Sequence, residues 1–593
     1  MDVKKLVFDL VGCKFTGPIE EIEKEGLYVK YDGKSAVIGG ESIPAKARAY
    51  MLLAKAIAEG KESYEVAQKP NFSTIGPMLD MSRSGVMTVE SVKKYLDYTA
   101  VHGMNMFMLY TEETYEVEGY PYFGYQRGRY TLKELQEIDD YAYSLGIEVI
   151  PCIQTLGHMS QYLRWPTTGP VKDHDNELLV GAEETYDLIR ACISTVRKAF
   201  RSNRIHIGCD EARMLGLGKY LRLNGYHDRF DLFNQHLERV TAICREYGYH
   251  PMMWSDMYYD IADKNKTEGY ATYVEVPQYA IDAMPDCDMV FWDYYNSGND
   301  FYRINIEKHN KFNRKILFAG GIWTWDGFIP YHTYTYATSK PALEECLRGG
   351  IKEVIITLWG NDGCETNYML GLPMLSVFSE YCWLGESCTE EDIWSISKFV
   401  TGMPRELAEA VSKFAIGEKG RHSAGKLILW SDPLIDLITK DFDFVAAQEY
   451  MKQALETFEK YPDHPDIEYF KAVFRVALQK AHIRAELRNR YLADDRQWLK
   501  DFADNKLPQL LADFEALQQI HYACWHKDYK THGFEQLMCR YGAAKERVKY
   551  AAVVINKYLA GELDQIAELE PEIFRVKPGR GGMAPEVMYI ATR

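Results

Sequence analysis

The amino-acid sequence predicts an α/β protein whose central domain is a (β/α)8 TIM barrel, with a small N-terminal α/β domain and a mostly helical C-terminal domain. Between about residues 70 and 360, eight apolar strand-like segments alternate with amphipathic helical stretches. After about residue 395 the strand signals stop. The 593 residues, 47% of them hydrophobic, suffice for more than one core. We therefore place the domains at residues 1–68, 69–395 and 396–593.

The first segment has two strand-like runs and one helical stretch. Leu6–Val11 and Leu27–Tyr31 are rich in the apolar and aromatic residues that favour strands. Asp32-Gly33-Lys34 is typical of a turn, and Pro44–Ile57 has helical character. These features predict a small α/β unit.

The central segment contains the strand signals of the barrel. Eight apolar runs are expected to be its strands: Ile75–Met81, Met104–Tyr110, Ile147–Ile153, Arg204–Asp210, Pro251–Asp256, Met289–Tyr295, Ile316–Trp323 and Val354–Trp359. The alternative is a doubly wound sheet with fewer strands.

Helices are expected between most of these strands. Thr88–His102 is amphipathic, and Thr131–Leu145 begins with a capping box formed by Thr131 and Glu134. A further helix is predicted over Pro341–Leu347, with the proline in its first turn.

The last segment has apolar residues at helical spacing. The pattern is clear over residues 466–490, 507–525 and 541–560. It contains no recognisable chemical motif, so its role is not predicted.

Composition and charge limit the partners. The net charge of −17, from 69 basic and 86 acidic residues, argues against nucleic acid and against an anionic membrane surface. The N-terminus lacks the apolar run of a signal peptide, and no stretch is long enough to span a bilayer. The 12 cysteines show no metal-ligand spacing, so we expect reduced thiols in a cytoplasmic protein with neither metal nor cofactor. Oligomeric state is not predicted, and a homodimer is one alternative.

Two adjacent carboxylates, Asp210 and Glu211, follow the alternating residues Ile205, Ile207 and Cys209. Chemistry in α/β barrels takes place at the carboxyl ends of the strands. Neighbouring side chains at a strand end diverge, so one carboxylate can stay ionised while the other carries a proton. The pair predicts acid/base chemistry, with a simple helix cap as the alternative.

The strand ends together resemble a known family, the β-N-acetylhexosaminidases of glycoside hydrolase family 20. The resemblance covers about residues 1–395 and is carried by five segments: Gly76 to Arg83 (GPMLDMSR), Val149 to His158 (VIPCIQTLGH), His206 to Glu211 (HIGCDE), Trp254 to Asp256 (WSD) and Leu358 to Asp362 (LWGND). The helical tail and the absence of a signal peptide resemble the cytoplasmic bacterial members.

The resemblance implies an exo-acting glycosidase with a substrate-assisted mechanism. Its substrate would be a glycan or glycoconjugate with terminal β-linked N-acetylglucosamine, and N-acetylgalactosamine is the second sugar to consider. Glu211 matches the general acid/base, and Asp210 matches the carboxylate that orients the 2-acetamido group. The acetamido oxygen acts as the nucleophile, so no protein nucleophile is needed.

The resemblance also implies a tyrosine that donates to the acetamido oxygen and tryptophans that bind the sugar. Tyr294 and Tyr295 are both candidates for the first role, and ordinary core tyrosines are the alternative. Further candidates for substrate binding lie near strand ends or in the loop after the eighth strand: Asp80, His158, Trp254, Trp323, Trp325, Trp359, Asp362 and Glu365. The alternatives are a core histidine for His158, aromatic residues that fill the barrel, and solvated loop acids.

This sequence departs from the family pattern at two places. Many members have an arginine where Ile75 stands, and Arg127, Arg129, Glu112 or Glu113 could replace its contacts. The common Asp-x-Pro-Gly-His pattern has Gln154 in place of aspartate and Leu156 in place of proline. Substrate preference, more than reaction class, depends on these changes.

Two other functions compete with the glycosidase. A non-catalytic glycan-binding protein on the same barrel would have no use for a proton donor such as Glu211. A metal-dependent hydrolase could use His158, His206 and Asp210, but the sequence has no HExxH or similar pattern.

Overall fold

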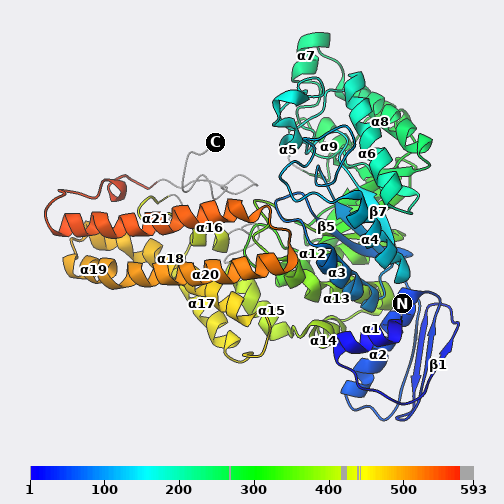
Figure 1. Cartoon of the computed structure of the whole chain (residues 1–593), viewed down its shortest axis with the longest axis horizontal. Coiled ribbons are helices and arrows are strands. Elements are labelled where there is room, and N and C mark those ends of the chain that lie inside the picture. Colours follow the sequence, from blue (N-terminus) through cyan, green and yellow to red (C-terminus); the bar gives the residue numbers. More distant parts are fainter. Residues whose placement is uncertain (1, 266–268, 416–423, 437–439, 441, 574–593) are drawn as a thin grey trace.

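The computed structural model describes the chain except residues 1, 266–268, 416–423, 437–439, 441 and 574–593. Figure 1 shows an N-terminal sheet with two helices in dark blue, a central barrel in blue to green, and a helical region in yellow to red. Helices α18 (Ile467–Leu492), α20 (Leu507–Asp528) and α21 (Phe534–Leu559) pack alongside one another and extend away from the barrel.

The N-terminal part is a four-stranded sheet covered by α1 (Val3–Val11) and α2 (Ile43–Ala58). The strands are β1 (Ile19–Ile22), β2 (Leu27–Tyr31), β3 (Ala36–Gly40) and β4 (Tyr64–Gln68), in the order β1-β3-β2-β4. The predictions of β2 and α2 are confirmed.

The prediction of a strand over Leu6–Val11 is wrong, because these residues belong to α1. Asp2 caps the helix by accepting a hydrogen bond from Lys5 N, and Gly12 ends it in the left-handed region. Leu6, Val7 and Leu10 recur at helical spacing, and Val7 is fully buried. In so short an apolar run, a helical repeat of about 3.6 residues cannot be distinguished from a strand.

The central strands close into a parallel barrel in chain order, which confirms the (β/α)8 prediction and excludes the doubly wound sheet. The barrel closes between the last strand and the first. Its strands are β5 (Thr74–Asp80), β6 (Met106–Tyr110), β7 (Glu148–Cys152), β8 (Arg204–His206), β9 (His250–Trp254), β10 (Asp288–Trp292), β11 (Ile316–Gly321) and β12 (Glu353–Leu358).

The barrel interior is a packed core of side chains. Met78, Met108, Ile150, Met252 and Ile355 are among its members, all at most 1% exposed. Tyr110 and Trp254 lie in the same cluster, and Trp359 packs against it. The carboxyl end of the barrel is therefore closed below by side chains rather than open as a channel.

Helices cover the outside of the barrel. The capping box predicted at Thr131 and Glu134 is confirmed at the start of α4. The helices of this part are α3 (Val89–Val101), α4 (Leu132–Ser144), α5 (Ser160–Leu163), α6 (Glu183–Ala199), α7 (Lys219–Asn224), α8 (Arg229–Glu246), α9 (Asp256–Ala262), α10 (Gln278–Asp282), α11 (Asn299–Asn310), α12 (His332–Arg348) and α13 (Leu375–Leu384).

The helix predicted over Pro341–Leu347 begins earlier, at His332, so Pro341 lies inside α12 and not in its first turn. The preceding residues are rich in threonine and tyrosine, which favour strands. Buried Thr335 and Thr338 hydrogen-bond through their hydroxyls to the carbonyls of Tyr331 and Tyr334 one turn back. Packing against the barrel thus outweighs local propensity.

The last part of the described chain is helical, as predicted. Besides α18, α20 and α21, it contains α14 (Glu390–Thr401), α15 (Arg405–Ser412), α16 (Ala424–Trp430), α17 (Phe444–Phe458) and α19 (Arg496–Asp501). Among the helices of the described residues, none combines the length and apolarity that crossing a bilayer requires.

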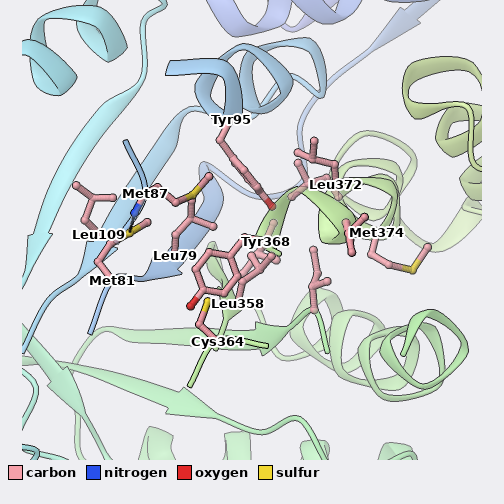
Figure 2. Packing of buried hydrophobic residues seen from close by; sticks show 14 of the residues in the cluster. Leu79, Met81, Met87, Tyr95, Leu109, Leu358, Cys364, Tyr368, Leu372 and Met374 are labelled. Carbon is pink, nitrogen blue, oxygen red and sulfur yellow. Dashed lines mark hydrogen bonds between the residues drawn. The ribbon is translucent and has the colours of Figure 1, made fainter. Parts of the chain in front are cut away.

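One buried cluster fixes the segment that follows β12. Figure 2 shows Leu79, Leu109 and Leu358, from three neighbouring barrel strands, together with Tyr95 of α3 and with Cys364 and Tyr368 beyond β12. The Tyr368 hydroxyl donates a 2.6 Å hydrogen bond to the carbonyl of Asp80 at the end of β5. The loop between β12 and Tyr368 is therefore held at the barrel mouth from both ends.

Candidate active site at the barrel mouth

The carboxylate pair lies on a strained loop just beyond β8. The strand ends at His206, earlier than the predicted Arg204–Asp210, and its continuation turns. Gly208, Cys209 and Glu211 have φ of 70°, 69° and 49°. Such values are costly for residues with a Cβ and occur where surrounding structure enforces them. The turn leaves Asp210 buried and Glu211 partly exposed.

Asp210 is held by a neighbour on each oxygen. Its Oδ1 accepts a 2.7 Å hydrogen bond from Gln154 Nε2, and its Oδ2 lies 3.0 Å from His158 Nε2. Burial raises the pKa of Asp210, but the charge and hydrogen bond of His158, together with hydrogen bonds from Gln154 and the backbone, bring it below the ordinary value. Asp210 is therefore a buried, ionised carboxylate.

His158 links the two carboxylates. Its Nε2 also lies 3.5 Å from Glu211 Oε2, while its Nδ1 lies 3.7 Å from Glu112 Oε1. Burial lowers the pKa of His158, yet the Asp210 charge raises it well above the ordinary value. Burial raises and His158 lowers the pKa of Glu211, which ends below normal. The site thus holds an imidazolium between two carboxylates.

Arg83 adds a second cation at the mouth. Its guanidinium lies 5.0 Å from the centre of the Tyr110 ring and 5.1 Å from that of Trp359. It also lies 3.5 Å from Glu112. Burial raises the pKa of Glu112 and Arg83 opposes this, leaving it at about 7.

Asp80 is engaged by protein groups on both oxygens. Oδ1 accepts from the backbone and hydroxyl of Ser82, and Oδ2 accepts from Gly360 N and pairs with Arg83 at 3.1 Å. Its side chain therefore joins β5 to the loop after β12. The structure brings Asp80 to the mouth through Arg83, and its substrate contact stays a prediction.

The predicted tryptophans form two groups. Trp359 lies at the centre of the mouth, with its ring centre 4.8 Å from Tyr110 and 6.1 Å from Trp254. Trp254 is fully buried in the barrel core, as the barrel-filling alternative expects. Trp323 and Trp325 stack 4.0 Å apart in an aromatic cluster with Tyr294, to one side of Trp359.

The two candidate tyrosines differ in burial. Tyr294 is 4% exposed, stacks on Trp292 at 5.3 Å and lies 5.5 Å from Trp325. Tyr295 is 49% exposed and packs edge-on against Trp323. Burial raises the pKa of the Tyr294 hydroxyl, with the Asp210 charge acting in the same direction. Tyr294 therefore lies inside the aromatic cluster, and Tyr295 lies at its more exposed edge.

The loop after β12 is bound to the helical domain. Glu365 is 2% exposed and pairs with Lys426 of α16 at 2.9 Å and with Arg540 of α21 at 2.7 Å. Trp430 Nε1 donates to it at 2.7 Å. The side chain of Asp362, in contrast, is 44% exposed and lies 3.4 Å from Lys426. Of the two predicted loop acids, Asp362 is the one open to a ligand.

A polar pocket of about 440 Å³ opens at this mouth. It extends from His158 to the first turn of α21, so barrel and helical domain both contribute walls. The lining residues are Ser82, Arg83, Ser84, Glu112, Arg127, His158, Ser160, Gln161, Arg164, Asp362, Gly363, Glu535 and Gln536. Of the replacements considered for the missing arginine, Glu112 and Arg127 reach this pocket, with Arg127 paired to Glu113 at 2.9 Å.

Four site residues were not assigned a role from sequence. Asp256 Oδ2 accepts a 2.9 Å hydrogen bond from Glu211 N, and Trp292 Nε1 donates to Asp256 Oδ1. Burial, reinforced by Asp210, raises the pKa of Asp256 well above normal. Arg83 and Gln154 are the others. Arg83, Gln154 and Asp256 lie within the sequence segments that carry the resemblance. A sequence segment does not show the direction in which a side chain points.

The described residues provide no set of ligands for the metal-dependent hydrolase that the sequence left open. His206 lies under Trp254, with ring centres 4.3 Å apart, and its Nδ1 accepts from Gly208 N. Burial lowers the pKa of His206 to about 3. Within the described part of the chain, no three histidine, cysteine or acidic side chains are arranged to hold a metal ion.

Comparison with known proteins defines the family. Residues 72–276 match the family described as "Glycosyl hydrolase family 20, catalytic domain", which is the class that the barrel and its carboxylate pair define. Residues 408–586 match "Glycoside Hydrolase 20C C-terminal domain". The chain belongs to glycoside hydrolase family 20.

The similar proteins are distant. Hexosaminidase D of Bos taurus is 27% identical over 38% of this chain and 62% of its own length. Beta-hexosaminidase 3 of Arabidopsis thaliana is 23% identical over 34% of this chain and 40% of its own length. The chain thus spans less than two thirds of the length of either relative. A solved structure of a beta-N-acetylhexosaminidase, 16% identical with a TM-score of 0.50, covers 66% of this chain and 94% of the other and shows the same fold.

Proposed function

We propose that this protein is an exo-β-N-acetylhexosaminidase. It releases terminal, non-reducing β-linked N-acetylglucosamine, or N-acetylgalactosamine, with retention of configuration. The observation that carries the proposal is the loop after β8, which presents buried, ionised Asp210 and partly exposed Glu211 around one imidazolium, His158. Two carboxylates in different environments are what acid catalysis next to charge stabilisation requires.

In the first step, the acetamido oxygen of the substrate attacks the anomeric carbon. The bond from that carbon to the leaving-group oxygen breaks, and Glu211 donates a proton to the departing oxygen. Asp210 accepts a hydrogen bond from the acetamido N–H and stabilises the positive charge of the oxazolinium ring that forms. In the second step, Glu211 takes a proton from water, whose oxygen attacks the anomeric carbon and reopens the ring.

Glu211 must hold a proton before the first step. A bound sugar removes water from its carboxylate, which raises the pKa of an acid. His158 Nε2, 3.5 Å from Glu211 Oε2, is a protonated group close enough to supply the proton. We infer that substrate binding moves the proton from His158 toward Glu211.

The aromatic cluster supports an acetamido pocket. Tyr294 and Trp325 lie together beside Trp359, and the apolar face of a sugar stacks well on such rings. We propose Tyr294 as the donor to the acetamido oxygen, because it is the buried member of the pair and its ring centre lies 6.4 Å from that of Trp359. Asp362 and Arg83 are proposed to bind the outer hydroxyls of the sugar.

The domain limits 1–68, 69–395 and 396–593 and a cytoplasmic location belong to the same proposal, and a homodimer stays one alternative for the oligomeric state. All twelve cysteines are free, which agrees with a reducing compartment.

A panel of chromogenic β-glycosides tests the function. The wild-type protein should hydrolyse the N-acetylglucosaminide or N-acetylgalactosaminide and leave the β-glucoside and β-galactoside almost untouched, because these lack the internal nucleophile. A thiazoline analogue of N-acetylglucosamine should inhibit strongly as a mimic of the intermediate. Comparable rates on the plain β-glucoside would exclude this mechanism, and tight binding without hydrolysis of any glycoside would favour the glycan-binding alternative.

A further inference from the structure

Gln154, just after β7, lies buried between Tyr110 and Asp210. Its Oε1 accepts a 3.2 Å hydrogen bond from Cys209 N. Because a backbone N–H can only donate, this contact identifies the oxygen end of the amide. The NH2 end must then donate, at 2.7 Å to Asp210 Oδ1 and at 2.8 Å to the Tyr110 hydroxyl oxygen.

This arrangement limits where Asp210 could carry a proton. Oδ1 accepts the Gln154 N–H, so a proton on Asp210 would have to lie on Oδ2, which faces His158 Nε2 at 3.0 Å. The loop is shaped to admit the amide, since a Cβ on Gly208 would lie 2.1 Å from Gln154 Oε1. The glycine at position 208 therefore leaves the space in which the Gln154 side chain reaches Asp210.

We propose that Gln154 is a positioning residue that keeps Asp210 in its hydrogen-bond-accepting form and aims it at the acetamido group of the substrate. The inference rests on the proposed function. Where family members have aspartate at this position, a carboxyl group would need a proton of its own to donate to Asp210. A glutamine amide donates at every pH, so here the alignment of Asp210 does not depend on a second titrating acid.

Several other groups face Asp210 and share its electrostatic environment. They come from neighbouring strand ends and loops: Arg83, Tyr110, Cys152, His158, His206, Cys209, Glu211, Asp256 and Tyr294. A test must therefore change residue 154 alone and compare each variant with the wild type at the same pH.

The test uses the full-length variants Gln154→Glu and Gln154→Met with an aryl N-acetylglucosaminide. Gln154→Met removes both donors, and we expect kcat to fall about 10- to 100-fold with a much smaller change in KM. In Gln154→Glu, the introduced carboxyl group can still donate to Asp210 while it is protonated. The ratio of variant to wild-type kcat should therefore be highest at low pH and fall as the introduced carboxyl group ionises with rising pH.

The control is Gln518→Glu, the same charge change on α20, where Gln518 accepts a 2.7 Å hydrogen bond from Lys545. Its kcat ratio should stay near one at every pH. A flat ratio for Gln154→Glu, with kcat of Gln154→Met within about threefold of wild type, would overturn the inference. If Gln154→Met fails to fold, the pH dependence of Gln154→Glu decides. A wild-type protein inactive on every glycoside would instead refute the proposed function.

Discussion

At the scale of single residues, the backbone of one loop separates two chemically similar groups. Asp210 and Glu211 are neighbours, but positive φ at Cys209 and Glu211 turns one inward and leaves the other partly open. Asp210 meets Gln154 and lies 3.0 Å from His158 Nε2, whereas the Glu211 carboxylate lies 3.5 Å from the same nitrogen and pairs with Arg213. A regular strand would only point the two side chains to opposite faces, without the burial of Asp210 that the turn provides.

Glu211→Gln removes the proton donor and keeps the shape. Turnover of glycosides with poor leaving groups should fall by about 10²- to 10⁴-fold, because a positioned acid contributes that much. Aryl glycosides whose leaving group departs without a proton should lose far less. Steady-state kinetics on one substrate of each kind measures the difference, and equal losses on both would contradict the role of Glu211.

The tyrosines form a matched pair. Tyr294→Phe should lower kcat by about tenfold or more, because a buried donor to the developing charge is lost. Tyr295→Phe, one residue further and 49% exposed, should lower it much less. The measurement is kcat and KM of both variants on the same N-acetylglucosaminide. A large effect for Tyr295→Phe and none for Tyr294→Phe would reverse our assignment.

The pKa of His158 predicts a pH dependence of stability. The folded protein raises this pKa well above the unfolded value near 6.5, so the charged form stabilises the fold. That contribution is complete below pH ~6.5 and is lost as pH rises through the folded pKa. Wild type should melt at a higher temperature than His158→Gln. This difference in melting temperature should shrink as pH rises above ~6.5 and through the folded pKa. A difference that grows with pH would show that His158 is neutral in the folded protein.

At the scale of elements, the loop after β12 joins the barrel to the helical domain. Gly360 N at its start donates a hydrogen bond to Asp80, its end is fixed by Tyr368, and Glu365 between them pairs with α16 and α21. The helical domain thus determines where Asp362 lies, although it carries no catalytic motif of its own.

Lys426→Met tests this coupling. Removing one partner of a buried ion cluster is expected to cost about 3–5 kcal/mol of folding free energy and to loosen the loop that carries Asp362. We expect a lower melting temperature and a higher KM. Lys545→Met, which breaks a surface pair with Glu515, should cost at most about 1 kcal/mol and leave KM unchanged. Equal KM values for the two variants would show that the helical domain does not influence substrate binding.

At the scale of the whole molecule, barrel and helical domain share one interior. Met87 bridges to Tyr529, Thr88 N donates to Asp528 O, and Tyr368 N donates to the Tyr529 hydroxyl. The buried apolar residues of both parts belong to one contiguous cluster. Stability in such an arrangement is shared between the two parts.

Cooperative unfolding follows from this shared interior. Scanning calorimetry of the full chain should show barrel and helical domain unfolding in one transition. Lys426→Met should shift that transition as a whole. Two separate transitions, with only the lower one moved by the substitution, would show that the helical domain is an independent unit.

Features that depend on local period and local chemistry could be predicted from the sequence. The eight apolar runs predicted the strands of the barrel, and their order placed Asp210, Glu211 and Trp359 at one end of it. The capping box at Thr131 and the helices after residue 395 were also predicted from the sequence. Such signals are readable because strands and helices repeat about every two or 3.6 residues.

Contacts between residues far apart in the sequence could not be predicted and became visible in the folded chain. The contact of Gln154 with Asp210 spans 56 positions and that of Glu365 with Arg540 spans 175, and neither leaves a periodic trace in the sequence. The same holds for α12, whose helix over threonine-rich residues is stabilised by packing on the barrel. Barrel closure and domain docking set these distances, because side-chain direction beyond a strand end depends on loop backbone angles that a residue pattern does not encode.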